Sequence, residues 1–167
     1  MTINPLLRDF QRHTVAPGAG RLVVDGIRCC LAGYRYEDLA CWETAWRVFE
    51  TTIPNGAVRR LMGELQFFSR TLIRLGRPEL RFRPFGCGGL STDEELVLDF
   101  LAALQNQDHA CARRIGSALV PLQNLPMFAE LVDAAESFVA ALNEADQELD
   151  RRSPDVANVL AGRIKLN

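Results

Sequence analysis

The chain has 167 residues, of which 48% are hydrophobic and 24% are charged, and its formal net charge is −2. This length suits one domain, because a single core usually serves about 100–200 residues and can then form without disulfides or metals. The small net charge gives no overall attraction to nucleic acid or to an anionic membrane.

The charges are unevenly distributed along the chain. Residues 1–83 contain 13 Arg and 8 acidic residues, a net of +5, whereas residues 84–167 contain 6 basic and 13 acidic residues, a net of −7. We expect the two halves to pack against each other within one domain; the alternative is a dipolar surface that steers a partner. Lys165 is the one lysine among 19 basic residues. The arginine preference fits either a GC-rich genome or a need for planar, bidentate donors.

The N-terminal part of the chain predicts two helices. The first covers residues 3–14, and the Pro/Gly-rich segment at residues 15–20 breaks it. The second covers residues 21–35, where apolar residues recur at the spacing of one helical face. Gly26 and Gly33 lie near that face and are small enough to permit a close helix crossing.

The third helix is predicted over residues 37–52. It places Trp42 and Trp46 one turn apart on the same side, in line with Leu39. Aromatic stripes on helices are usually part of a core, so we expect both tryptophans to be buried. The alternative is a pocket near Tyr34, Trp42 and Trp46 in which a ligand stacks on the rings.

Four further helices are predicted, over residues 55–76, 91–105, 108–119 and 126–150. Ser91 and Glu94 have the spacing of a capping box, and acidic residues fill the first turn that follows. Asp108 is the expected N-cap of the next helix, and Pro126 is expected in the first turn of the last one.

These elements predict an all-α fold, a single-domain helical bundle of six or seven helices, three of them long, with no significant sheet. We expect the domain to cover residues 1–167, with residues 1–20 as an N-terminal helix and Pro/Gly linker and residues 151–167 as a loosely packed C-terminal tail.

No pattern in the sequence indicates catalysis, a metal or a cofactor. The five cysteines include no CxxC pair, and no pair of Cys or His has a usual zinc spacing. Cys87 precedes a helix start, which would lower its thiol pKa, but the acidic first turn from Asp93 to Glu95 is expected to oppose that effect. We therefore expect a turn here and not a nucleophile, with no catalytic residue, no metal site and no cofactor.

The segment between the helices ending near Gly76 and starting at Ser91 is the best candidate for a binding site. It combines arginines with aromatic residues and one thiol, and its candidate binding residues are Arg77, Arg81, Arg83, Phe85 and Cys87. Guanidinium groups there could hold an acidic surface or an anion. Nucleic acid is not expected, because the second half of the chain is acidic. We expect Arg81 and Arg83 to face outward, while Phe82 and Phe85 attach the loop to the bundle.

The sequence favours a non-catalytic helical protein-interaction or regulatory module that binds a protein partner or self-associates. The alternative is a small-molecule-binding or enzymatic helical bundle, with an aromatic pocket near Trp42, Trp46 and the Arg81–Cys87 loop. No secretory signal and no long apolar run occur in the sequence, so we expect a cytoplasmic protein without a membrane span.

Overall fold

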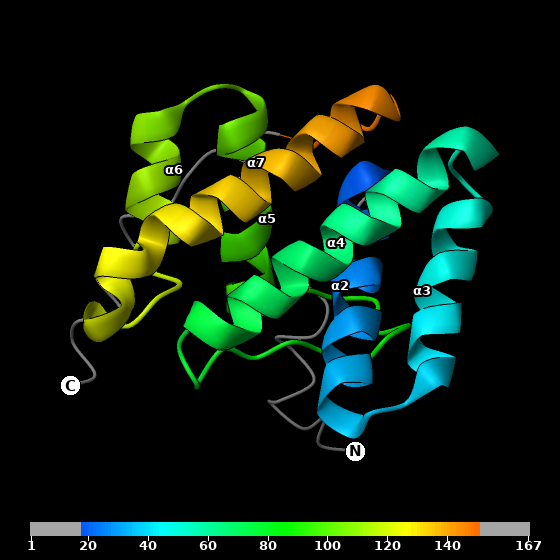
Figure 1. The fold of residues 1–167 in the computed structure, drawn as a ribbon, viewed down its shortest axis with the longest axis horizontal. Helices are drawn as coiled ribbons and strands as arrows, with labels where there is room; N and C mark the ends of the chain where they lie inside the picture. Colours follow the sequence, from blue (N-terminus) through cyan, green and yellow to red (C-terminus); the bar gives the residue numbers. More distant parts are fainter. Residues whose placement is uncertain (1–17, 151–167) are drawn as a thin grey trace, which may run out of the picture.

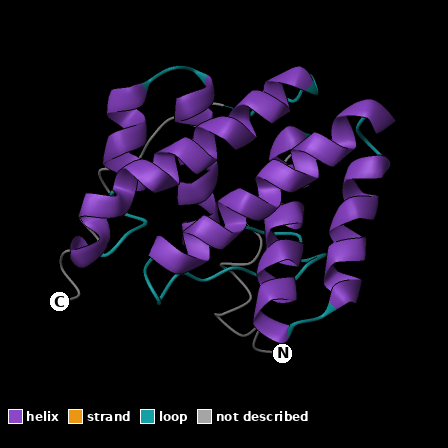
Figure 2. Cartoon of the chain, viewed as in Figure 1, coloured by secondary structure: helices purple, strands orange, loops and turns teal. Residues whose placement is uncertain are grey.

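A computed structural model describes residues 18–150, and the predicted helix at residues 3–14 and tail at residues 151–167 lie outside this range. The described residues form six α-helices and one 3-10 helix, with no strand among them (Figures 1 and 2). The elements are α2 (Ala19–Tyr36), α3 (Leu39–Glu50), α4 (Asn55–Leu75), α5 (Thr92–Gln105), α6 (His109–Gly116), η2 (Leu122–Met127) and α7 (Phe128–Glu144). The predicted all-α bundle is confirmed for these residues.

The helices are arranged in pairs around one core. α4 and α7 lie side by side across the view of Figure 1, α2 and α3 form a second pair at one end, and α5 packs against both α7 and α6. The core contains one fully buried phenylalanine from each of α3, α4, α5 and α7, namely Phe49, Phe68, Phe100 and Phe138. Since these rings come from four helices, the core joins elements that are far apart in the sequence.

Glycines allow α2 and α3 to approach each other closely. A methyl group added at Gly26 would lie 2.6 Å from the ring of Phe49, and one added at Gly33 would lie 2.6 Å from the ring of Trp42. Real side chains do not tolerate such distances, so only glycine permits this packing without movement of the rings. The expected close helix crossing is confirmed.

Arginines of the first half of the chain pair with carboxylates of the second half. Among the described residues, four such ion pairs join helices or loops of the two halves: Arg28–Glu94, Arg60–Glu144, Arg74–Glu130 and Arg77–Asp93. Two of them link the opposite ends of α4 and α7, which therefore run antiparallel. The two oppositely charged halves do pack against each other.

The stripe predicted to bury α3 is only partly correct. Trp42 is half-buried, but Trp46 is 37% exposed and Leu39 is 77% exposed. Ala45 and Phe49 form the buried side of this helix. α3 lies at the edge of the bundle and packs against α2 and α4 on one side, so residues on its other sides are exposed to solvent.

The last helix is shorter than predicted at both ends. Leu122–Met127 is a 3-10 helix, because Pro126 lacks an N–H and disfavours an α conformation in the residue before it. At the other end the N–H of Gln147 donates to the carbonyl of Leu142, and Asp146 adopts a left-handed φ of 54°. This is a Schellman motif with Asp in the usual place of Gly, which the sequence pattern did not indicate.

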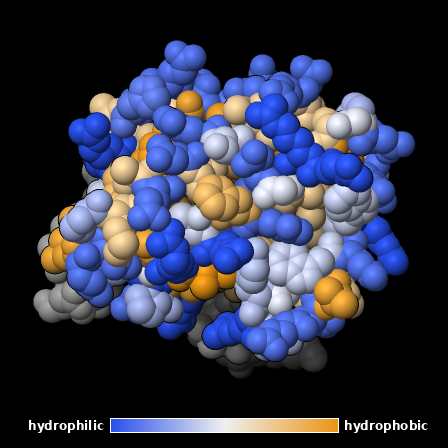
Figure 3. Space-filling view, viewed as in Figure 1, coloured by the Kyte–Doolittle hydropathy of each residue, from blue (hydrophilic) through white to orange (hydrophobic). Residues whose placement is uncertain are grey.

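The surface mixes polar and apolar residues. On the face in Figure 3, exposed apolar side chains form small patches separated by hydrophilic ones. No helix within residues 18–150 has both the length and the hydrophobicity that a bilayer span requires.

Candidate functional site

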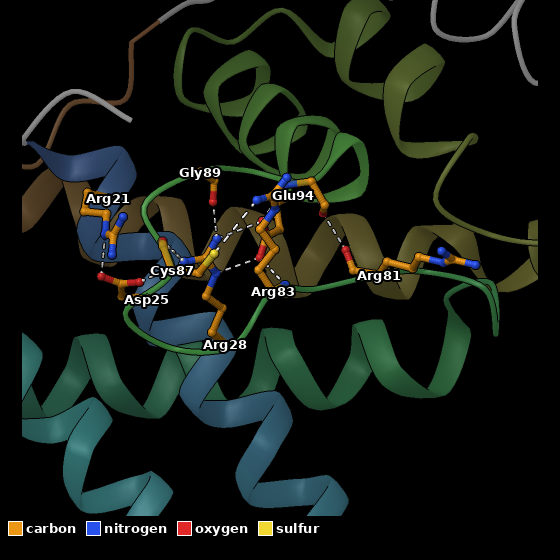
Figure 4. A network of polar contacts seen from close by, with 9 residues as sticks. Arg21, Asp25, Arg28, Arg81, Arg83, Cys87, Gly89 and Glu94 are labelled. Carbon is orange, nitrogen blue, oxygen red and sulfur yellow. Dashed lines mark hydrogen bonds and ion pairs between the residues drawn. The ribbon is translucent and has the colours of Figure 1, made fainter. Parts of the chain in front are cut away.

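The side chain of Arg28, in α2, is fully buried at the centre of a polar network (Figure 4). Its Nε and Nη2 donate to the two carboxylate oxygens of Glu94 at 2.7 and 2.9 Å. Nη2 also donates to the carbonyl of Gly89 at 2.6 Å, while Nη1 donates to the carbonyl of Cys87 at 2.8 Å and to Asp25 at 3.3 Å. A guanidinium has five N–H donors, so every donor of Arg28 has an acceptor.

These contacts keep Arg28 charged inside the protein. Burial by itself would lower the pKa of Arg28, but the hydrogen bond and the charge of Glu94, followed by the charge of Asp25, raise it. A buried charge is tolerated only when it is both paired and hydrogen-bonded, and Arg28 meets both conditions.

The start of α5 positions Glu94. Ser91 and Glu94 form the predicted capping box: the Ser91 side chain accepts from the Glu94 N–H, and Glu94 accepts from the Ser91 N–H at 2.7 Å. The Glu94 carboxylate also accepts from the backbone N–H of Arg83 at 2.8 Å. Two bonds from Arg28 and two from backbone amides therefore fix this carboxylate in one place.

Residues 77–90 are attached to α5 by further bonds. The backbone N–H of Arg81 donates to Asp93 at 2.8 Å, and the hydroxyl of Ser91 donates to the carbonyl of Arg81 at 2.5 Å. The guanidinium of Arg77 lies 3.7 Å from Asp93. Because Arg28 binds two carbonyls of the same loop, the loop is held from α2 on one side and from α5 on the other.

A pocket of about 570 Å³ lies beside this network. Its walls come from the C-terminal half of α2, the C-terminal end of α4 and residues 77–85. Its aromatic lining residues are Tyr34, Tyr36, Phe82 and Phe85, and its arginines are Arg28, Arg35, Arg77 and Arg83. Arg28 and Leu72 are buried on its inner side, whereas Tyr36, Ile73 and Phe85 are exposed at its mouth.

The structure brings together part of both predicted sites. Arg77, Arg83 and Phe85 from the loop line the same pocket as Tyr34 from the alternative aromatic site. Trp42 is not among the lining residues, but it supports the pocket because its ring packs edge-on against the Tyr34 ring, with 4.5 Å between the ring centroids.

Arg81, Trp46 and Cys87 are not among the residues that line this pocket, and Arg83 and Phe85 line it in orientations other than those predicted. The side chain of Arg81 is exposed and points away from the network, as Figure 4 shows. Trp46 does not line the pocket either. Arg83 does not face outward as expected: it is half-buried, and its guanidinium lies 3.8 Å from the Cys87 sulfur. Phe85, expected to attach the loop, is 48% exposed, whereas Phe82 does pack against the core.

Sequence reasoning missed Arg28 and Arg35 as site residues and recognised Glu94 only as a cap. One signal for Arg28 was present. Residues 22–30 are apolar nearly all round the helix apart from Asp25 and Arg28. A helix buried on all sides requires that any charge within it is paired.

The thiol of Cys87 is half-buried in the loop. Partial burial raises its pKa, but hydrogen bonds from Arg83 and the Gly89 backbone, with the charges of Arg83 and Arg28, outweigh that effect and lower the pKa below its ordinary value. The acidic first turn of α5 does not prevent this, because Arg28 pairs with Glu94 and Arg77 lies near Asp93.

Two other thiols differ from Cys87. Burial raises the pKa of both Cys29 and Cys30 to about 12.

Among residues 18–150 no group of three or more His, Cys, Asp or Glu side chains is arranged to hold a metal ion.

Comparison with known proteins adds no relative to this description: no family model, curated protein or solved structure matches the chain.

Replacing Glu94 by Gln should lower the free energy of unfolding by about 3–5 kcal/mol, because it removes the carboxylate that pairs closely with the buried charge of Arg28 and leaves only the longer pair with Asp25. Chemical denaturation measures this loss. Glu144→Gln is the matched control, since its pair with Arg60 is exposed and should contribute less than about 1 kcal/mol. Adding Arg28→Met to Glu94→Gln should recover part of the lost free energy of unfolding. If the losses of the two single variants simply add in the double variant, Arg28 and Glu94 are not a coupled buried pair.

Replacing Arg83 by Gln should raise the pKa of Cys87 and slow its alkylation by iodoacetamide near neutral pH, because the thiolate is the reactive form. Peptide mass spectrometry over a pH series measures the rate at each cysteine, and the midpoint for Cys87 should move to higher pH. Arg81→Gln is the control, since that side chain points away. Equal profiles for both variants would show that Arg83 does not lower the pKa.

Proposed function

We propose that this chain is a small-molecule-binding helical module, and that the pocket between α2, α4 and residues 77–85 is its ligand site. The observation that carries the proposal is the lining, in which four aromatic residues and four arginines contribute to one pocket. A concave apolar site with a few polar groups is the usual form of a small-molecule site.

The size of the pocket supports a small ligand. Its volume of about 570 Å³ lies within the range of roughly 300–1,000 Å³ that is common for such sites. Leu72 is buried on its inner side and Leu80 and Phe82 are half-buried, so an apolar ligand entering the pocket would be removed from water.

Rigidity of the loop supports the same proposal. One wall of the pocket is the loop that Arg28, Asp93 and Glu94 hold to two helices. A wall fixed before binding need not be ordered by the ligand, which improves affinity.

The chemistry of the lining favours binding over catalysis. Besides its guanidinium groups, the polar side chains of the lining are the hydroxyls of Tyr34 and Tyr36. Arginine does not lose its proton near neutral pH, and burial raises the pKa of Tyr34 above its ordinary value. Such groups orient a ligand well and are poor general acids or bases.

A protein-interaction module, which the sequence favoured, is the second candidate, and a different surface supports it. In η2, Leu122 is 83% exposed, and Leu125 and Met127 are 39% and 38% exposed. No residue of this short helix is buried. Neighbouring exposed apolar residues are a common feature of contact surfaces.

Native mass spectrometry of the protein purified from its own host tests the first proposal. The wild type should retain a small molecule, and Ala32→Trp should lose it, because Ala32 lines the pocket and a tryptophan there would occupy it. Ala129→Trp is the matched control, since Ala129 is exposed on α7 and outside the lining.

A wild type that carries no small molecule, or an Ala32→Trp variant that carries as much as wild type, would contradict the proposal. Retention of a protein partner by both tryptophan variants, with its loss in Leu122→Ser, would support the second candidate instead. A thermal melt of each variant checks that it remains folded.

A further inference from the structure

We infer that the ligand of this pocket is an aromatic acid, with a flat apolar body held inside the pocket and an anionic group at its mouth beside Arg35. This inference rests on the proposed function, because it names the class of ligand for the same pocket.

The charge of the lining is positive. Within residues 18–150, the residues that line the pocket include four arginines and no carboxylate side chain. The carboxylates of Glu94 and Asp93, which pair with Arg28 and Arg77, belong to residues outside the lining. A concave surface whose charged groups all have one sign attracts a ligand of the opposite sign.

The contacts of Arg28 exclude it as the anion-binding group. All five of its N–H donors are used within the protein, and its side chain is fully buried. An anion cannot bind it without breaking a bond to Glu94, to Asp25 or to the loop. Arg28 therefore shapes the pocket, and the anion must bind elsewhere.

Arg35 is placed to bind the anion. It lies in the last turn of α2, is exposed, and lines the mouth of the pocket. Its acidic neighbours in the chain, Glu37 and Asp38, are not lining residues, and the Asp38 carboxylate accepts from the N–H of Ala40. An exposed guanidinium can turn to form a bidentate pair with a carboxylate or phosphate.

The apolar part of the lining favours a flat ring. Phe82 and Phe85 come from the loop and Tyr34 and Tyr36 from α2. The Tyr34 ring is fixed, because it packs edge-on against Trp42 and its hydroxyl donates to the carbonyl of Gln66 at 3.3 Å. Fixed aromatic surfaces pack well against aromatic ligands in stacked or edge-on arrangements.

Isothermal titration calorimetry on the full chain tests this inference with two probes of nearly the same shape, the naphthoate anion and neutral naphthamide. Naphthoate should bind at least about tenfold more tightly, because a charge-assisted hydrogen bond replaces a neutral one. Raising the salt concentration should weaken naphthoate binding and leave naphthamide binding nearly unchanged.

Arg35→Gln should weaken naphthoate binding by about tenfold and leave naphthamide binding unchanged. Arg47→Gln is the matched control, because Arg47 is an exposed arginine in the last turn of α3 and lies outside the lining. An equal loss in both variants would show a general effect of surface charge and would overturn the inference.

Two further outcomes separate this inference from the proposed function. If naphthamide binds as tightly as naphthoate and Ala32→Trp abolishes binding of both, the pocket is a ligand site but not one for acids. If neither probe binds the wild type at millimolar concentration, the inference fails, whereas the proposed function still stands if the protein from its own host retains a small molecule that Ala32→Trp loses.

Discussion

A buried guanidinium group must have its charge balanced and all its donors satisfied, and this requirement at Arg28 determines how the candidate site is built. The group lies in α2, its carboxylate partner comes from α5, and two of its acceptors are carbonyls of the loop before α5. Satisfying one side chain therefore fixes three segments relative to one another. This arrangement also fixes one wall of the pocket, which residues 77–85 form. The backbone of this segment is bonded to Glu94 at Arg83, and the chain that follows it is bonded to Arg28 at the carbonyls of Cys87 and Gly89.

The identity of this residue also bears on the arginine preference of the chain. A lysine has three donors on one nitrogen and could not make five bonds in the plane of a fork. At Arg28 the geometry requires arginine, whatever the base composition of the genome. The pairs Arg60–Glu144 and Arg74–Glu130 are about half exposed and would tolerate lysine. These exposed pairs give no structural reason for arginine, so the preference has a physical cause at some positions and none at others.

The sequence predicted the elements of this fold well because their signals are local. The capping box at Ser91 and Glu94, the cap at Asp108 and the glycines of α2 all act within a turn or on a neighbouring helix, and the structure has them as expected. The prediction that Trp46 is buried was wrong. Its burial depends on which helices lie at the edge of the bundle, and the spacing of residues along the chain does not contain that information.

The candidate site was predicted only in part, for the same reason. Its loop residues were recognised from their composition, but their partner Arg28 is 66 residues away from Glu94 along the chain. The lowered pKa of Cys87 likewise depends on Arg83 and Arg28 more than on the acidic turn beside it in sequence. The position of Arg28 is decided by tertiary pairing, which a pattern within one segment cannot reveal. Arg83 is only four residues from Cys87, but its contact with the thiol depends on how the loop folds, which residue spacing does not show.

Amide hydrogen exchange of the loop tests the central claim, that the Arg28–Glu94 pair holds the wall of the pocket in place. The backbone N–H groups of Arg83 and Ser91 both donate to the Glu94 carboxylate. They should exchange as slowly as the core amides of α5, because opening them requires breaking the buried pair. Exchange at the rate of an unstructured peptide, while the amides of α5 stay protected, would contradict the account.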